Sequence, residues 1–327
     1  MIHITEEMVK DIYKMKDCLQ DVEKAFQYYM NNEITTPVRL NIQHSQEEAN
    51  SLYMPSYVAP IEFASTKIVS IFPQNTQKGK KALQSLIVLT ETNTGDHVAT
   101  IEASYLTTLR TGAMSGIATE HFARQDASVC AVIGCGAQAL GQIQAVMEVR
   151  SLTRILLVNR TIQKAFEFKN QLRSLYPNWS GSIEIMESAD DAVAMADIII
   201  CSTTSTTPVF DGTHLKPGTH INGIGSYQPH MQELDFITLQ RSEKIIVDTL
   251  EGVQHEAGDF LIASEQNKWD FSNIYSELGD IILGHKQGRA NPDEITLFKS
   301  VGVAFLDTVV AGSIYQKYTE KLPVEWE

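Results

Sequence analysis

The sequence predicts an α/β protein whose larger part is a doubly wound parallel sheet. From about residue 128 onward, short apolar runs alternate with helical patterns, as in "SVCAVIG", "RILLVNR", "DIIICST" and "EKIIVDT". Strands that alternate with helices are joined by right-handed crossovers, which gives a parallel sheet covered on both faces. A glycine-rich turn directly follows the first of these strands. The first third of the chain instead mixes helical and antiparallel strand patterns, which favours a second, α+β domain.

Three helices and one β-hairpin are predicted outside the alternating region. The run "DCLQDVEKAFQYYM" has apolar residues at 3-4-3 spacing, which predicts an amphipathic helix capped by Asp17. Two β-rich runs around an Asn-Thr-Gly-Asp turn, "SLIVLTE" and "HVATIE", predict a hairpin. "EASYLTTLRTGAMSGIATEHFA" predicts a long helix whose small residues let another backbone or a ligand come close. The stretch "ITLFKSVGVAFLDTVVAGSIYQKY" predicts a final helix.

Composition limits the classes of partner. The 327 residues suggest about two domains, and the net charge of −14, from 26 basic and 40 acidic residues, argues against nucleic acid and anionic membranes. No apolar run approaches the ~20 residues of a membrane helix, and the N-terminus does not resemble a signal peptide. The cysteines have no CxxC or metal-ligand spacing. We therefore expect buried free thiols, no metal site and a cytoplasmic location.

The glycine-rich turn predicts a dinucleotide site. "VIGCGAQALG" places Gly134 and Gly136 directly after a strand, with Ala139 in the third small position at the start of a helix. The first glycine permits a tight turn, the second lets a pyrophosphate approach the backbone, and the helix N-terminus attracts the anion. We predict that Gly134, Gly136, Ala137 and Gln138 contact the cofactor; the alternative is a plain tight turn.

The end of the next strand predicts which dinucleotide binds. An NAD site usually has an acidic residue there, about 20 residues after the glycines, to hold the ribose 2′-hydroxyl. This strand ends instead at Asn159, Arg160 and Thr161, and Arg160 can pair with a 2′-phosphate. The alternative is an ordinary surface arginine. We predict NADPH as the cofactor, with NADH as the second choice.

With these motifs placed, the chain resembles the ornithine cyclodeaminase/mu-crystallin family over essentially its whole length. The matching segments include "TPVRLNI", "STKIVSIFP", "EASYLTTLRTGAMSGIA", "VIGCGAQA", "GTHINGIGS" and "FKSVGVAFLDT". The resemblance implies a Rossmann-type dinucleotide-binding domain over residues 121–299. It also implies a substrate-binding and dimerisation domain over residues 1–120 and 300–327, and therefore a homodimer.

The resemblance assigns roles to cations that are unusual in their patterns. Lys67 lies on the mostly apolar face of "FASTKIVSIF", where an edge-strand charge is the structural alternative. In the family, Lys67 would contact the substrate carboxylate or donate a proton. Arg110 and Arg39 match carboxylate-binding arginines, although solvated surface arginines would explain both. Further matches are cofactor-contacting Arg110, Thr111, Thr203 and Ser300, and substrate-side Glu256.

One turn departs from part of the family. Cyclodeaminases and alanine dehydrogenases of the family have an Asp as general base where "GIGSYQP" has Ser226, next to the cofactor-side Gly225. A serine hydroxyl without a partner base is a poor proton acceptor near neutral pH. The resemblance therefore implies ketimine reduction by NADPH of a cyclic imine carboxylate, with Lys67 or water held by Ser226 supplying the proton.

Other functions stay open on the sequence. The same residues are compatible with an ornithine cyclodeaminase, an amino-acid dehydrogenase, or an enzyme that forms N-substituted amino acids by reductive condensation. A protein that binds NADP and a small carboxylate without turnover is a further alternative.

Overall fold

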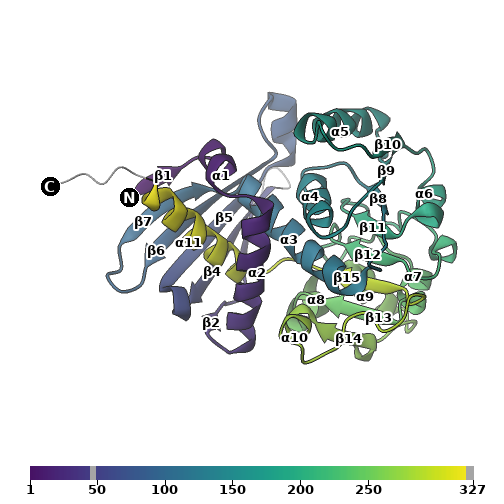
Figure 1. The fold of residues 1–327 in the computed structure, drawn as a ribbon. Coiled ribbons are helices and arrows are strands. Elements are labelled where there is room, and N and C mark those ends of the chain that lie inside the picture. Colours follow the sequence, from purple (N-terminus) through teal and green to yellow (C-terminus); the bar gives the residue numbers. More distant parts are fainter. Residues whose placement is uncertain (45–48, 322–327) are drawn as a thin grey trace. The chain divides into compact units, whose positions relative to one another are not determined.

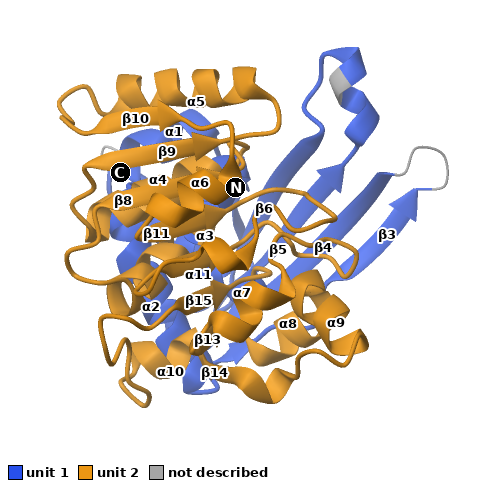
Figure 2. Cartoon of the chain, turned by 90° about the vertical axis from the view of Figure 1, so that its right-hand side faces the viewer, with its two compact units in different colours: residues 1–110, 303–327 blue, residues 111–302 orange. Residues whose placement is uncertain are grey.

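The computed structural model describes residues 1–44 and 49–321 of the chain. It divides into two compact units, which Figure 2 shows in different colours. Unit 1 consists of residues 1–110 and 303–327, and unit 2 of residues 111–302. Each unit is built around its own sheet.

Among the residues that the structure describes, unit 1 contains a seven-stranded sheet in the order β1-β7-β6-β5-β4-β2, with β3 also paired to β4. Of these described strands, only β1 and β7 pair in parallel; the other pairs are antiparallel. The predicted hairpin is confirmed as β6 and β7, and Gly95 in its turn has φ +82°. The strand bounds are β1 Ile2–Ile4, β2 Ile34–Thr35, β3 Leu40–His44, β4 Ala49–Val58, β5 Phe63–Ile71, β6 Leu83–Glu91 and β7 His97–Glu102.

Two helices of unit 1, α2 (Met15–Met30) and α11 (Ala304–Glu320), pack side by side, and α11 also packs on β4, β5 and β6 (Figure 1). The shorter α1 (Glu6–Ile12) contacts α11. The predicted cap of α2 is wrong by three positions. The helix begins after Lys14, and the Asp17 side chain reaches back to accept a hydrogen bond from the Lys14 backbone N–H at 3.0 Å.

The final predicted helix is also partly wrong. Its first residues form strand β15 (Thr296–Lys299) in unit 2, and α11 begins only at Ala304. A four-residue apolar run next to a helix has no periodicity of its own that separates the two structures. The long predicted helix is confirmed as α3 (Ser104–Phe122).

Unit 2 contains an eight-stranded sheet in which every pair is parallel, in the order β10-β9-β8-β11-β12-β15-β13-β14. The other strand bounds are β8 Val129–Ile133, β9 Arg154–Val158, β10 Ser182–Ile185, β11 Ile198–Cys201, β12 His220–Gly223, β13 Lys244–Val247 and β14 Ile274–Glu277. The order reverses at β8, because β9 and β10 continue on one side of it and β11 begins the other.

Helices cover both faces of this sheet, which confirms the doubly wound α/β fold. Alternate residues of β8 enter different cores: Cys130 and Val132 pack with α4 and α5, whereas Ala131 and Ile133 share a core with α6 to α9. The helix bounds are α4 Ala139–Val149, α5 Ile162–Leu175, α6 Ala189–Met195, α7 Phe236–Arg241, α8 Leu250–Glu256, α9 Gly258–Glu265 and α10 Leu278–Ile282.

The small residues of α3 permit a close backbone approach within unit 2, as predicted. A Cβ atom added to Gly112 would lie 2.1 Å from the carbonyl oxygen of Gly141 in α4. No side chain larger than hydrogen fits this contact, so the backbone at the start of α4 packs directly against the backbone of α3. The prediction of buried thiols is also confirmed, because all four cysteines are buried and free.

Candidate functional site: a glycine edge and a buried cation pair

Four predicted cofactor positions follow four neighbouring strands of unit 2. The last residues of β8, β11, β12 and β15 are in register: Ile133 pairs with Cys201, Cys201 with Gly223, and Gly223 with Lys299. Gly134, Thr203, Gly225 and Ser300 come one or two residues later, so they line one edge of the sheet. In open parallel sheets, ligands bind outside the carboxyl ends of the strands where the strand order reverses. That reversal lies between β8 and β11.

The glycine turn after β8 has the backbone that a pyrophosphate needs. Gly134 has φ +95°, and a Cβ atom there would lie 2.6 Å from the Thr203 side chain. The Ser202 hydroxyl donates to the Gly134 carbonyl at 2.9 Å and fixes the turn. At Gly136, by contrast, an added Cβ would meet nothing within 4 Å, and the residue is exposed. The turn is therefore rigid at its first glycine and open at its second, where an anion can approach α4.

The end of β9 presents a cation and no carboxylate. Asn159 is held by the turn itself, since its Oδ1 accepts from the Cys135 N–H at 2.9 Å and its Nδ2 donates to the Thr161 carbonyl at 2.8 Å. Arg160 and Thr161 are exposed, and Arg160 forms no ion pair with any residue that the structure describes. Ala137 is exposed and Gln138 half-buried at the start of α4. The hydrogen bond between Cys135 and Asn159 thus joins the end of β9 to the glycine turn.

The backbone of the turn after β12 is hydrogen-bonded to the carboxylate of Glu233, a residue that we did not predict. Glu233 is fully buried; its Oε1 accepts from the Thr203 N–H at 2.5 Å, and its Oε2 accepts from the N–H groups of Gly225 at 2.6 Å and Ser226 at 3.1 Å. The ends of β11 and β12 are therefore bridged by one side chain. The Ser226 side chain is also fully buried, and its hydroxyl donates to the Met231 carbonyl at 2.8 Å.

The buried ion pair of Asp259 and Lys299 lies next to Glu233 and holds its backbone in place. Asp259 Oδ1 accepts from the backbone N–H groups of Glu233 at 2.7 Å and Leu234 at 2.9 Å, and its Oδ2 lies 2.7 Å from Lys299 Nζ. The side chains of Asp259 and Lys299 are both 0% exposed. Burial raises the pKa of Glu233 to about 7, with Asp259 acting in the same direction and Lys299 opposing it. We call Glu233, Asp259 and Lys299 the buried triad.

Ser300 belongs to a separate turn that begins after β15. Its hydroxyl donates to Asp248 Oδ2 at 2.7 Å, and the same oxygen accepts from the Val301 and Gly302 N–H groups at 2.9 and 2.8 Å. Gly302 has φ +85°, which a residue with a side chain rarely adopts. Asp248 thus anchors a left-handed turn. The Ser300 hydroxyl is used within this turn.

Unit 1 contains a buried cluster of charges between β5 and the two helices α3 and α11. Lys67 Nζ lies 2.6 Å from Asp307 Oδ2, and Arg110 Nε lies 3.1 Å from Asp307 Oδ1. The three side chains are 2%, 6% and 1% exposed for Lys67, Arg110 and Asp307. The predicted cations Lys67 and Arg110 therefore meet at one carboxylate, and we call these three residues the cation cluster.

The electrostatics of the cation cluster favour a proton donor at neutral pH. Burial lowers the pKa of the Lys67 ammonium, Asp307 opposes this shift, and Arg110 and Arg39 add to it, so that the resulting pKa is about 8. Arg39 itself is half-buried just before β3. Of the remaining predicted residues, Thr111 is buried next to Arg110 on α3, and Glu256 is half-buried as the last residue of α8.

Among the residues that the structure describes, sequence patterns missed five charged side chains that are fully buried: Glu233, Asp248, Asp259, Lys299 and Asp307. A signal was present in two of them, because Lys299 interrupts the apolar strand "TLFK" and Asp307 interrupts the apolar helix stretch "AFLDTVV". Charges on apolar faces need partners. The partners of these two lie far away in sequence, so their identity emerges only from the fold.

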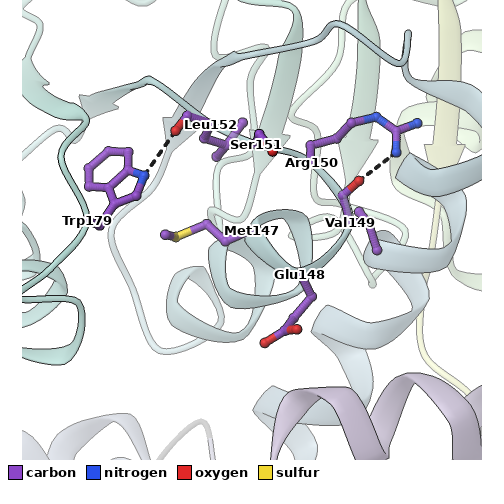
Figure 3. A pocket seen from close by; sticks show the side chains of 7 residues that line it. All are labelled: Met147, Glu148, Val149, Arg150, Ser151, Leu152 and Trp179. Atoms are coloured by element: carbon purple, nitrogen blue, oxygen red, sulfur yellow. Dashed lines mark hydrogen bonds between the residues drawn. The ribbon is translucent and has the colours of Figure 1, made fainter.

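A pocket of about 360 Å³ lies elsewhere in unit 2, near the amino ends of β9 and β10. Two of its polar side chains are bonded to the backbone: Trp179 Nε1 donates to the Leu152 carbonyl and Arg150 Nη1 to the Val149 carbonyl (Figure 3). Arg150 also donates to four backbone carbonyls around the end of α3. None of the residues that line this pocket is a predicted site residue, so we do not assign the pocket to the candidate site.

The parallel sheet and its glycine edge define a protein of the dinucleotide-binding Rossmann class. The sequence profile of the ornithine cyclodeaminase/mu-crystallin family matches residues 1–322. The chain belongs to this family.

Several relatives align with this chain over nearly its full length. The Δ(1)-pyrroline-2-carboxylate reductase of Bacillus cereus is 36% identical over 321 residues, covering 98% of each chain. The structure of the Thermococcus litoralis Δ(1)-pyrroline-2-carboxylate reductase in complex with NADH and L-proline superimposes with a TM-score of 0.93, at 36% identity and 98% coverage of both chains. An archaeal alanine dehydrogenase dimer with bound NAD gives a TM-score of 0.89 at 31% identity, with 98% and 96% coverage.

No helix among the described residues is long and apolar enough to cross a membrane. Nor do these residues contain a group of three or more His, Cys, Asp or Glu side chains that could hold a metal ion.

Proposed function

We propose that the protein reduces a cyclic imine carboxylate with NAD(P)H, converting Δ1-pyrroline-2-carboxylate to L-proline or the six-membered Δ1-piperideine-2-carboxylate to L-pipecolate. The observation that carries this proposal is the cation cluster of Lys67 and Arg110 at Asp307. Two buried cations are suited to a small carboxylate, and one of them has a pKa close to neutrality. A general acid works best when its pKa lies near the operating pH.

Unit 1 would hold the substrate and unit 2 the dinucleotide. Arg110 would bind the carboxylate, with Arg39 adding positive charge, and Lys67 would donate a proton to the imine nitrogen. A bound nicotinamide would supply the hydride to the C=N carbon. The product amino acid gains one hydride and one proton, and Lys67 recovers its proton from solvent. Gly134, Gly136 and the start of α4 would hold the pyrophosphate.

The turn after β12 supports reduction over deamination. The Ser226 side chain supplies no carboxylate, and its hydroxyl is directed to the Met231 carbonyl in a buried position. A base that activates water or removes a proton from an amine is therefore missing from this position, whereas imine reduction needs only a proton donor. In this proposal Lys67 is the donor, and Ser226 shapes the turn beside Gly225.

An assay of nicotinamide oxidation tests the proposal. The purified protein is supplied with NADPH or NADH and with five- or six-membered cyclic imine carboxylates; ornithine, and pyruvate with ammonia, serve as comparisons. We expect turnover with an imine and little ammonia release from ornithine. Comparable ammonia release would favour a cyclodeaminase, and faster pyruvate amination an amino-acid dehydrogenase. Binding without any turnover would favour a non-catalytic ligand-binding protein.

We also propose a preference for NADPH over NADH, because exposed Arg160 stands where NAD sites have a carboxylate. An Arg160→Ala variant should raise KM for NADPH by about tenfold or more, since a charge-assisted bond contributes about 1.5–3 kcal/mol. KM for NADH should change little. Lys268→Ala, which removes another exposed cation of unit 2, is the matched control. Equal KM changes for both cofactors would contradict the preference.

A homodimer is the assembly we propose, formed through the outer face of the unit 1 sheet. Phe63, Ser65 and Lys67 point to α11, as their contacts with Tyr315, Thr308 and Asp307 show. The next residues along β5 therefore face the other way. The outer face includes Leu40, Ile42 and Tyr57, which are 59%, 43% and 38% exposed. Apolar side chains on an uncovered sheet face favour a second copy of the chain as partner.

Sedimentation analysis tests the dimer. The wild-type protein should sediment as a dimer, and Ile42→Asp should shift it to monomer, because a carboxylate at an apolar interface core is desolvated without a partner. Ile162→Asp, at a 51% exposed apolar residue of unit 2, controls for surface charge. A monomeric wild-type protein, or association unaltered by Ile42→Asp, would refute this interface.

The buried free thiols also agree with our proposal of a reducing cytoplasmic location.

A further inference from the structure

Asp307 is a carboxylate in an apolar helix. Its neighbours Phe305, Leu306, Val309 and Val310 are buried, and it lies in the first turn of α11. Placing a charge in such a setting costs several kcal/mol unless partners compensate, and well-packed apolar side chains would often be as stable. The helix N-terminus contributes some stabilisation of the negative charge. These terms explain how Asp307 is tolerated, but they do not require a carboxylate at this point.

The two partners of Asp307 are the two cations that the proposed function uses. Asp307 accepts from Arg110 through Nε only, at 3.1 Å, and no described residue accepts from the terminal nitrogens Nη1 and Nη2. A guanidinium held at Nε keeps its planar end fixed, and this end has the geometry for a bidentate contact with a carboxylate. The other oxygen of Asp307 holds Lys67 Nζ at 2.6 Å.

We propose that Asp307 is the positioning residue of the imine site: it fixes Arg110 so that Nη1 and Nη2 form the carboxylate clamp, and it holds Lys67 as the protonated donor. This inference rests on the proposed function, because it concerns the same two cations. It adds a third group that touches neither reacting atom and acts through both cations. It also explains why two like charges can remain side by side in a buried cluster before substrate arrives.

Asp307 also sets the proton affinity of the donor. Its negative charge raises the pKa of Lys67, against the lowering by burial, Arg110 and Arg39. Met54 and Ile87, the cross-strand partners of Lys67 on β4 and β6, are apolar and add no compensating charge. Without the Asp307 charge, Lys67 would therefore lose its proton at a lower pH.

The test compares Asp307→Asn with wild type in two assays. In imine reduction we expect KM for the imine to rise about ten- to hundredfold, the loss expected for a misoriented charge-assisted contact. We also expect the alkaline limb of the pH–rate profile to move to lower pH. In calorimetry, binding of L-proline should weaken by a similar factor. Thr308→Val, next to Asp307 on α11, removes only the bond to Ser65 and is the matched control.

Asp307→Glu keeps the charge but moves it by one methylene. It should raise KM while leaving the alkaline limb near its wild-type position, and it replaces Asp307→Asn if that variant does not fold. Unchanged KM, L-proline affinity and alkaline limb in a folded Asp307→Asn protein would overturn the inference, as would a wild-type KM in Asp307→Glu. If the wild-type protein reduces no imine yet Asp307→Asn weakens L-proline binding, the proposed reaction fails and the clamp stands.

Discussion

Replacing Lys67 with methionine should reduce kcat/KM for imine reduction by about 10²–10⁴-fold, the usual contribution of a positioned general acid. Methionine keeps most of the apolar stem and removes the ammonium that lies 2.6 Å from Asp307. Arg110 still neutralises Asp307, so the variant should fold. The companion variant Lys67→Met/Asp307→Asn removes both charges and shows whether any loss arises from an unpaired carboxylate. Activity within a few-fold of wild type in Lys67→Met would exclude Lys67 as the donor.

The pH dependence gives this result an independent check. Because burial lowers the pKa of Lys67 from 10.5 to about 8, the protonated donor is lost as pH rises through about 8, and wild-type kcat/KM should fall there. The residual activity of Lys67→Met should lack that limb. Stability depends on pH in the opposite direction. Because the pKa of Lys67 is lower in the folded state than in the unfolded chain, protonated Lys67 destabilises the folded state, and this cost declines as pH rises from about 8 to 10.5.

The largest expected loss of stability follows from Asp259→Ala in the buried triad. The substitution leaves the Lys299 ammonium fully buried without its partner and removes the acceptor of two backbone N–H groups. Breaking a buried pair in this way costs about 3–5 kcal/mol. Urea unfolding followed by circular dichroism measures the change in the free energy of unfolding.

Two further variants make the measurement specific. Asp126→Ala removes a carboxylate that is 79% exposed and paired with Arg124, so it should cost less than about 1 kcal/mol. Asp259→Leu/Lys299→Met removes both buried charges and should be more stable than Asp259→Ala, because no unpaired ion remains. A cost for Asp259→Ala no larger than that of Asp126→Ala would mean that water reaches Lys299.

Local patterns were sufficient for most of the parallel sheet. The turn at Gly134 and Gly136 is short-range, and its strand and helix have distinct periodicities, so the sequence predicts it well. The same is true of α3, whose small residues meet the backbone of α4 at Gly112. Strand β15 was missed because four residues carry too little periodicity, and its place between β12 and β13 depends on pairing across more than 50 residues of chain.

The candidate site was predictable only in part. Lys67 and Arg110 stood out as cations in apolar or small-residue surroundings, and the family resemblance gave them roles. Their common partner Asp307 lies 197 residues beyond Arg110, so no local pattern joins them. For Ser226 the sequence was misleading: its position suggested a polar group that faces a cleft, whereas its hydroxyl is buried and donates a hydrogen bond to the Met231 carbonyl.

The carboxylate of Glu233 makes folding a proton-consuming reaction under mildly acidic conditions. Its pKa of about 7 in the folded protein lies above the ordinary glutamate value of 4.5 that the unfolded chain should have. Between these two values the folded state retains a proton that the unfolded chain releases, so this residue's contribution to stability declines as pH rises from 4.5 to 7. Heat absorbed on unfolding in that window will therefore depend on the ionisation enthalpy of the buffer.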